Sequence, residues 1–249
     1  MQLKLENNYV ILLTACVNPG NMPHTSITNQ DIRLQSYIDA LEFYTNKINC
    51  PIVFVENSGV DISNFIENKE NIEFITFKGN NFDKKKGKGY GEGEIIKYAF
   101  QNSKILKECN NKLIIKITGR HIVNNIRTIL QIDNILSIGQ ERVVAHIHKK
   151  SRITNSAMFI GSKKFFIDYF LANINNIDES KHIWFEHALY NAMYQYSKDK
   201  KGKCVNIPIE LHKTGKCGST GSTFKKPNLK QHITCIIKFV LYKLNIKKL

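Results

Sequence analysis

A short run of basic and hydroxyl side chains follows an apolar segment near the middle of the chain. It reads Lys116-Ile-Thr118-Gly-Arg120-His121. A buried strand ending here would bring these side chains to one edge of a sheet, where cations could neutralise a diphosphate without a metal. A solvated basic rim is the alternative, and these residues alone favour neither.

A glycine-rich segment precedes that run, with glycine at every second position from Gly87 to Gly93. Because glycine has no Cβ, backbone amides and Lys88 could approach a phosphate closely in such a turn. The segment matches neither a Walker loop, which needs Gly-Lys-Ser/Thr, nor the dinucleotide fingerprint, which follows a first strand. The alternative is a flexible solvated turn, and a methyl-donor site is disfavoured for the same positional reason.

A second loop rich in glycine, hydroxyl and lysine residues occurs late in the chain, at residues 212–221. It contains Lys216, Gly218, Ser219 and Thr220. The loop could close over a diphosphate, where its hydroxyls, amides and lysine would stabilise a departing nucleotide. A disordered surface loop is the alternative.

The elements that must position these residues alternate between strand and helix. Apolar, β-prone runs predict strands at 9–17, 51–56, 72–77 and 112–119, and helical spacing predicts helices at 31–47 and 94–107. Further on, strands are expected at 142–148, 157–161 and 205–211, and helices at 163–172 and 180–196. This α/β order places the ligand-binding loops at the carboxyl ends of the strands.

Composition limits the classes of protein that remain. The chain has 249 residues and a net charge of +15, which favours an anionic partner: nucleic acid, phospholipid or nucleotide phosphate. Six scattered cysteines form no CxxC pair, so no zinc site is expected. The sequence has no apolar run of about 20 residues, and residues 1–8 are too polar for a signal peptide, so we expect a cytoplasmic protein.

The order of these features resembles the GT-A glycosyltransferases of bacterial capsule and lipopolysaccharide synthesis. The likeness covers roughly residues 9–225: an arginine-bearing helix with Arg33, a strand ending in Glu56-Asn57-Ser58, then the glycine-rich turn. It implies a GT-A-like, Rossmann-like fold, a mostly parallel sheet flanked by helices. It also implies one catalytic domain at 1–228, with a nucleotide-sugar half at 1–125 and an acceptor half at 126–228.

The resemblance further assigns roles to residues. The donor nucleotide would contact Thr14, Arg33, Glu56, Asn57, Ser58, Lys88 and Gly89. The diphosphate would contact Lys116, Thr118, Arg120, His121, Lys216, Gly218, Ser219 and Thr220. Because the basic run occupies the place of the family's metal-binding Asp-x-Asp, we predict no metal and no other cofactor, the nucleotide-sugar being a substrate.

In such transferases a carboxylate on a helix acts as base on the acceptor hydroxyl. The matching position is Glu186, followed by His187, which could orient the base or bind acceptor; Asp178 and Glu179 are the reserves. Both Glu186 and His187 lie off the apolar stripe of the expected helix. A solvated carboxylate favoured by the helix dipole is the alternative.

The last segment, 229–249, combines an apolar helical stripe with lysines. The stripe runs from Ile233 to Leu244, with Lys238, Lys243, Lys247 and Lys248 around and beyond it. Such a helix could lie in an anionic membrane surface, where a lipid-linked acceptor is held. Its alternative is a terminal helix docked on the core.

Together these features predict a transferase that moves sugar from a nucleotide-sugar to a glycan hydroxyl, peripherally bound to the inner face of the plasma membrane. A basic nucleic-acid-binding module without enzymatic activity is the second hypothesis. It is disfavoured because no recognition helix, RNA-recognition motif or zinc signature is found, and because much of the charge lies in loops and the tail.

Overall fold

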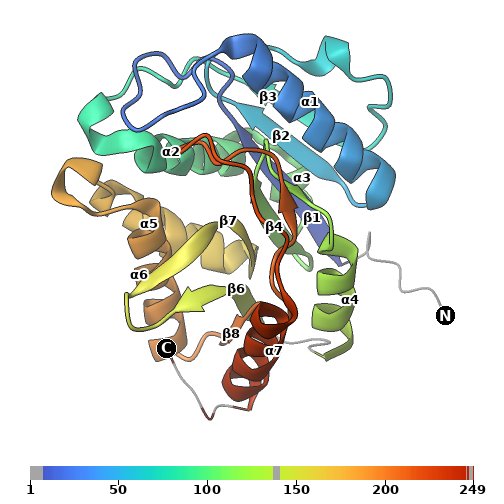
Figure 1. The fold of residues 1–249 in the computed structure, drawn as a ribbon, viewed down its shortest axis with the longest axis vertical. Helices are drawn as coiled ribbons and strands as arrows, with labels where there is room; N and C mark the ends of the chain where they lie inside the picture. Colours follow the sequence, from blue (N-terminus) through green and yellow to red (C-terminus); the bar gives the residue numbers. More distant parts are fainter. Residues whose placement is uncertain (1–7, 137–140, 245, 247–248) are drawn as a thin grey trace.

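A seven-stranded sheet with helices packed against it forms the body of the protein (Figure 1). The structure, a computed structural model, describes residues 8–136, 141–244, 246 and 249. The strands are β1 Tyr9–Ala15, β2 Ile52–Glu56, β3 Ile72–Thr76, β4 Leu113–Thr118, β6 Arg142–His148, β7 Ile153–Ser162 and β8 Lys203–Asn206. The helices are α1 Gln30–Lys47, α2 Gly87–Asn102, α3 Lys104–Glu108, α4 Ile126–Leu136, α5 Leu171–Asn173, α6 Phe185–Lys198 and α7 Leu229–Lys243.

The sheet is mostly parallel, as the sequence predicts. Its order is β3-β2-β1-β4-β7-β6-β8, and the pairs that include β7 are antiparallel while the others are parallel. The chain builds outward from β1 towards β3, then returns to place β4 on the other side of β1. This reversal is the place where open α/β sheets bind ligands.

Hydrophobic runs and pairing register explain why three strands end together. Every residue of β1 and β2 is buried, as expected for strands covered on both faces. Thr14 pairs with Thr118 of β4, and Ala15 pairs with Glu56 of β2. The carboxyl ends of β1, β2 and β4 therefore lie at one level.

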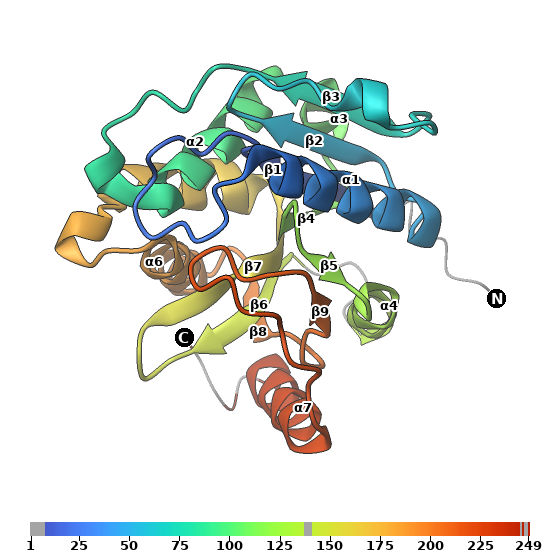
Figure 2. The same cartoon turned by 45° about the horizontal axis from the view of Figure 1, so that its top comes forward.

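Helices α1 and α2 cover opposite faces of this region (Figure 2). The ring of Tyr37 in α1 packs edge-on against Phe54 of β2, with centroids 6.1 Å apart. On the other face, Thr14 of β1 donates a hydrogen bond to Glu92 of α2. Farther along the sheet, α6 packs on β7 and α7 on β8.

The prediction of a glycine-rich turn at residues 87–93 is wrong, because α2 already begins at Gly87. The glycines serve close packing instead. A Cβ on Gly87 would lie 2.1 Å from Glu179, one on Gly91 2.6 Å from Phe82, and one on Gly93 2.9 Å from Ile174. A helix with larger residues at these positions could not approach its neighbours so closely.

Other boundaries differ from the sequence prediction. The strand expected at 157–161 is longer, and the one expected at 205–211 is the short β8. The helix expected at 163–172 is a π-helical turn, Phe165–Phe170, followed by α5, and the helix expected from 180 begins at Phe185. Beyond α2, α3 is a separate helix with Ser103 as its cap.

The predicted C-terminal amphipathic helix is present as α7. Lys247 and Lys248, expected beyond it, lie outside the described residues, as do residues 1–7. Among the described residues, no helix has both the length and the apolar character required to cross a bilayer.

Candidate functional site

A cavity of about 280 Å³ opens where β1, β2 and β4 end. Side chains from both halves of the chain line it, including several the sequence singles out. The predicted residues that line it are Thr14, Arg33, Asn57, Lys88, Gly89, Thr118, Arg120, His121, Glu186, Gly218 and Ser219.

The carboxylate of Glu92 joins the ends of β1 and β4. Its Oε1 accepts hydrogen bonds from Thr14 Oγ1 (2.8 Å) and Thr118 Oγ1 (3.0 Å) and lies 2.7 Å from Lys116 Nζ. Burial raises the pKa of this carboxyl, but Lys116 and the two hydroxyls outweigh that and hold it below its ordinary value. Glu92 is therefore a fixed negative charge at the cavity wall.

Lys116 does not line the cavity, in contrast to its expected contact with diphosphate. Its side chain is fully buried, and its ammonium donates to Ser156 O (2.8 Å) as well as pairing with Glu92. Burial lowers its pKa and Glu92 opposes that shift. Lys116 thus supports the carboxylate and is not positioned to contact a ligand.

Three groups around the cavity have polar atoms without hydrogen-bond partners among the described residues. They are Asn57 Oδ1, Arg120 Nε and both ring nitrogens of His121. Burial, together with the nearby cations Arg120 and Lys213, holds the pKa of His121 well below its ordinary value, so its ring is neutral at pH 7. Because buried polar groups are normally satisfied, these atoms indicate a place for a polar ligand.

Cationic side chains give the same cavity a positive charge. Lys88, Arg120 and Lys213 line it, and none forms an ion pair with a carboxylate in the described parts of the chain. The ammonium of Lys213 lies over the ring of Phe224, 4.3 Å from its centroid. An anion would therefore find unpaired cations here.

Glu186, the predicted base, lines the cavity from the first turn of α6. Its Oε1 accepts a hydrogen bond of 2.6 Å from Ser156 Oγ, a residue of β7. Glu179, the reserve, also lines the cavity, but its carboxylate accepts the amide of Gly89 at 2.8 Å. Burial raises the pKa of Glu179 against that bond. Glu186 thus keeps an acceptor oxygen that no described residue uses, whereas Glu179 accepts a backbone amide in the first turn of α2.

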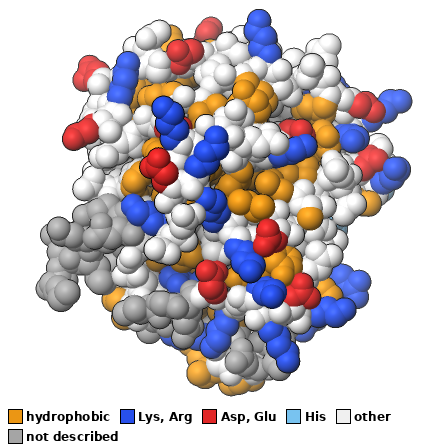
Figure 3. All heavy atoms as spheres, turned by 180° about the vertical axis from the view of Figure 1, so that it is seen from behind, with side chains coloured by type: hydrophobic (Ala, Val, Ile, Leu, Met, Phe, Trp, Pro, Cys, Tyr) orange, Lys and Arg blue, Asp and Glu red, His pale blue; other side chains and the backbone are white. Residues whose placement is uncertain are grey.

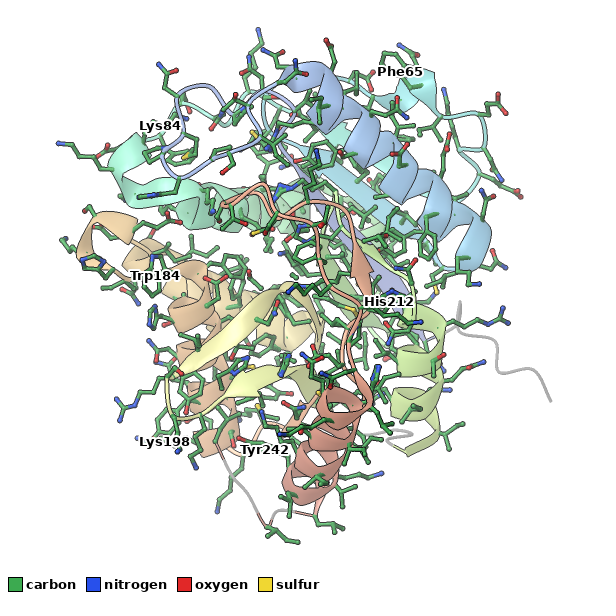
Figure 4. The ribbon with its side chains drawn as sticks, in the orientation of Figure 1. Phe65, Lys84, Trp184, Lys198, His212 and Tyr242 are labelled. Atoms are coloured by element: carbon green, nitrogen blue, oxygen red, sulfur yellow. The ribbon has the colours of Figure 1, made fainter. Side chains whose placement is uncertain are left out.

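A segment from 213 to 224, here called the strap, covers one side of the cavity. It starts after His212 as β9, Lys213–Thr214, which pairs with β5, Ile122–Val123, directly after His121 (Figure 4). At its turn Gly218 O accepts from Ser26 N at 2.9 Å, and Lys88 donates to Ser219 Oγ. The strap is thus held at its start and at its turn.

Gly218 lets the strap approach Arg120. A Cβ at this position would lie 2.1 Å from a guanidinium nitrogen. Cys217, beside it, also lines the cavity; burial raises its pKa, but hydrogen bonds from Thr220 and Ser219 outweigh this and lower it to about 7. The strap therefore places at the cavity a thiol with a lowered pKa.

Two residues assigned to the nucleoside shape loops instead. Glu56 is buried and accepts the amides of Val17 and Val60, each at 2.9 Å, and the hydroxyl of Ser58. Neither Glu56 nor Ser58 lines the cavity. Arg33 does line it, although its guanidinium already donates to Cys16 O at 2.8 Å.

The remaining predicted residues lie beside the cavity. His187 Nδ1 accepts the amide of Trp184 at 3.1 Å, so this ring caps α6. Lys216 and Thr220 belong to the strap without lining the cavity. Sequence reasoning missed Glu92, Lys213, Cys217 and Phe224; for Glu92 the available signal was a carboxylate between two glycines.

The first turn of α2 supplies a direct test of the glycine packing. Gly87 has φ 82° and ψ 175°, a conformation almost confined to glycine, and faces Glu179. We expect Gly87→Ala to lower the free energy of unfolding by about 2–3 kcal/mol, from backbone strain and displacement of Glu179.

The matched control is Gly20→Ala, since Gly20 also has positive φ but a Cβ at that position would have no neighbouring atom within 4 Å. Gly20→Ala should lower the free energy of unfolding by about 1 kcal/mol, from backbone strain alone. Chemical denaturation measures both. Equal losses would show that the close approach of Glu179 is unimportant.

Comparison with known proteins finds fold likeness at low identity. No family model and no curated protein matches the sequence. The galactosyltransferase LgtC, solved with donor and acceptor sugar analogues, is 10% identical over 73% of this chain and 69% of its own, with a TM-score of 0.43. Mouse xyloside xylosyltransferase 1 is 9% identical over 80% and 85%, with a TM-score of 0.43.

A third solved structure is 4-diphosphocytidyl-2C-methyl-D-erythritol synthase from Anaerococcus prevotii. It is 12% identical over 93% of this chain and 98% of its own, with a TM-score of 0.41. These values are too low to place the chain in any of the three families.

Proposed function

We propose that the protein transfers a sugar from a nucleotide-sugar to a hydroxyl of a glycan. The observation that carries the proposal is the cavity itself, which is lined both by Lys88, Arg120 and Lys213, cations without a carboxylate partner among the described residues, and by Glu186 with its open acceptor oxygen. Transfer from a diphosphate leaving group needs both functions close together.

The donor would lie along the ends of β1, β2 and β4. Its diphosphate would be held by Lys88, Arg120 and Lys213, which have no carboxylate partners among the described residues. The unpartnered Asn57 Oδ1 is an acceptor suited to a nucleoside N–H or O–H. These groups support a donor half in residues 1–125, completed by the strap.

The acceptor would enter beside α6 and β7. Its hydroxyl oxygen attacks the anomeric carbon while Glu186 accepts the hydroxyl proton, and the bond from that carbon to the diphosphate oxygen breaks. The leaving oxygen takes the bonding electrons, and Arg120 and the lysines stabilise its charge. This sequence of bonds inverts the anomeric carbon.

Cationic side chains would take the place of the family's metal in this scheme. The residues at the end of β4, Thr118 and Arg120, include no carboxylate, and Glu92 is already held by Lys116 and two threonines. We therefore propose that donor binding needs no divalent ion.

Thermal unfolding in the presence of UDP, GDP, CMP and their sugar conjugates tests the proposal. A nucleotide that binds only the native state, present at a concentration 100 times its Kd, should stabilise that state by about 2.7 kcal/mol. We expect one nucleotide class to raise the midpoint, and EDTA to leave the rise unchanged. Loss of the rise in EDTA would overturn only the metal-free scheme.

The nucleic-acid hypothesis predicts another outcome. No response to any nucleotide, with tight oligonucleotide binding that falls steeply with salt, would favour it. The geometry gives it less support, because Lys88, Arg120 and Lys213 line a cavity rather than an open surface.

We further propose that α7 lies on an anionic membrane surface, close to a lipid-linked acceptor of bacterial surface polysaccharide synthesis. The helix packs on the core through Cys235, Phe239 and Tyr242, so most of its predicted apolar stripe faces away. Lys and Arg side chains and exposed apolar atoms lie together at this end of the molecule (Figure 3). In α7 itself, Ile233 and Ile237 are exposed at 46% and 54%.

Co-sedimentation with vesicles of phosphatidylglycerol and phosphatidylcholine tests this surface. Replacing Ile233 and Ile237 together by serine should weaken binding at least about 10-fold, because both lose apolar burial. Ile135→Ser, at an exposed isoleucine of α4, is the matched control and should bind as wild type does. Equal binding of all three proteins, or none by wild type, would contradict the proposal.

A further inference from the structure

Three metal-ligand side chains that do not line the cavity converge where β6 meets α7. They are His146 of β6, Glu210 between β8 and β9, and Cys235 of α7, and one ligand atom from each lies within 4.8 Å of the others. His146 Nδ1 is 3.4 Å from Glu210 Oε1, and Cys235 Sγ is 3.4 Å from Glu210 Oε2.

These separations suit a tetrahedral ion. With Zn–N, Zn–O and Zn–S bonds of about 2.0–2.3 Å, tetrahedral angles place the ligand atoms about 3.3–3.5 Å apart. The nitrogen and the sulfur approach different oxygens of one carboxylate, and an ion would replace the hydrogen bond that Cys235 Sγ donates to Glu210 Oε2.

The cluster is shielded from solvent and incompletely bonded. Cys235 is 1% exposed, and the side chains of His146 and Glu210 are 11% and 18% exposed. Among the described residues His146 Nδ1 has no hydrogen-bond partner of good geometry, and its contact with Glu210 Oε1 at 3.4 Å is an ion pair only if the ring is protonated. A buried ring nitrogen that lacks a hydrogen bond of good geometry and lies beside a carboxylate is available to a metal ion.

Neighbouring groups shape the charge of this cluster. His148 stacks on His146, with centroids 4.6 Å apart, and Lys238 of α7 interacts electrostatically with both His148 and Cys235. The buried side chain of Asn206 donates to Ile207 O and accepts the amide of Ile147 beneath the site. Glu210 and a thiolate would together neutralise a divalent ion.

We propose that His146, Glu210 and Cys235 bind one divalent cation of the zinc class. A thiolate with an imidazole selects zinc over magnesium or calcium, which need oxygen ligands. Coordination displaces the thiol proton to solvent, and the fourth position of the tetrahedron takes water. The site is separate from the cavity and does not depend on the proposed sugar transfer.

Such an ion would join three distant parts of the chain. It would attach α7, on which Figure 4 shows Tyr242, to the sheet and to the segment that leads into the strap. The sequence predicts no zinc site because its three ligands are 64 and 25 residues apart, far from any known short spacing.

Cobalt titration of the chelator-stripped full chain tests the site. Bound by one thiolate in a tetrahedral site, Co²⁺ should give an intense near-ultraviolet charge-transfer band that saturates at one ion per chain, and Zn²⁺ should abolish it. Zinc alone should also raise the thermal midpoint of the wild-type protein.

Two cysteine variants separate the site from adventitious binding. Cys235→Ser should lose the charge-transfer band and bind Co²⁺ more than about 100-fold more weakly, exceeding the loss seen for outer-shell partners. Cys204→Ser, at another buried thiol outside the cluster, should keep the band. His146→Gln should weaken Co²⁺ binding. Because Cys235 is still present in this variant, the charge-transfer band should still appear at high Co²⁺ concentration.

A wild-type chain, folded by circular dichroism, that shows no saturable band would overturn the proposal. So would a band that survives in Cys235→Ser or is lost in Cys204→Ser. Because the band is read without substrate, these outcomes are independent of whether the cavity transfers sugar.

Discussion

Glu186→Gln should lower the turnover of sugar transfer by about 10²–10⁴-fold, the range for loss of a general base. The amide keeps the shape of the side chain and its hydrogen bond to Ser156 but cannot accept the acceptor proton. The measurement is release of nucleoside diphosphate from the donor identified by thermal unfolding. Donor affinity should change little, because Glu186 forms no ion pair with a cation in the described part of the chain.

Glu179→Gln separates this base from its reserve. Its carboxylate is already bonded to Gly89, so the substitution should disturb stability more than turnover. Glu42→Gln, on the exposed surface of α1, controls for loss of a charge. If Glu179→Gln abolished transfer while Glu186→Gln did not, the base would have been assigned to the wrong carboxylate.

Lys116→Met should lower the free energy of unfolding by about 3–5 kcal/mol, because it leaves the Glu92 carboxylate buried with only two hydroxyl donors. For a chain of this length the thermal midpoint should fall by about 6–20 °C. Denaturant unfolding measures the loss. A variant as stable as wild type would show that the pair contributes little.

The double variant Lys116→Met, Glu92→Gln provides the control, since it removes both charges. It should be more stable than Lys116→Met alone. At acid pH, the difference in free energy of unfolding between wild type and Lys116→Met should also become smaller. Without the lysine, burial raises the pKa of Glu92 in the folded state above its unfolded value, so protonation at low pH favours folding. A deficit that is constant with pH would contradict this cause.

The arrangement of the strands could be predicted because it depends on local patterns. The apolar runs that became β1, β2 and β4 are continuous and bounded by turn residues, and parallel strands with helices between them must end at one edge. This is why Thr14, Asn57 and Arg120, far apart in sequence, were expected to meet, and why they do line one cavity.

Residues whose role depends on tertiary partners could not be predicted. A lysine at the end of a strand is a residue type that often binds phosphate. Only the position of Glu92 on α2 shows that the ammonium of Lys116 is already paired with a carboxylate. Glu56 is similar, because backbone amides of its own loop surround it. Alternate glycines normally indicate a turn, and only the neighbouring Glu179, Phe82 and Ile174 explain why they form a helix here.

The four glycines of α2 also affect how this helix opens and closes. Each costs about 0.8–1.0 kcal/mol of helix stability relative to alanine, so residues 87–93 hold their helical form through contacts with other elements. Those contacts come from both halves of the chain. The start of α2 should therefore be among the first regions to unfold locally and exchange its amide hydrogens, and a donor that fixes Lys88 and the strap would protect it most.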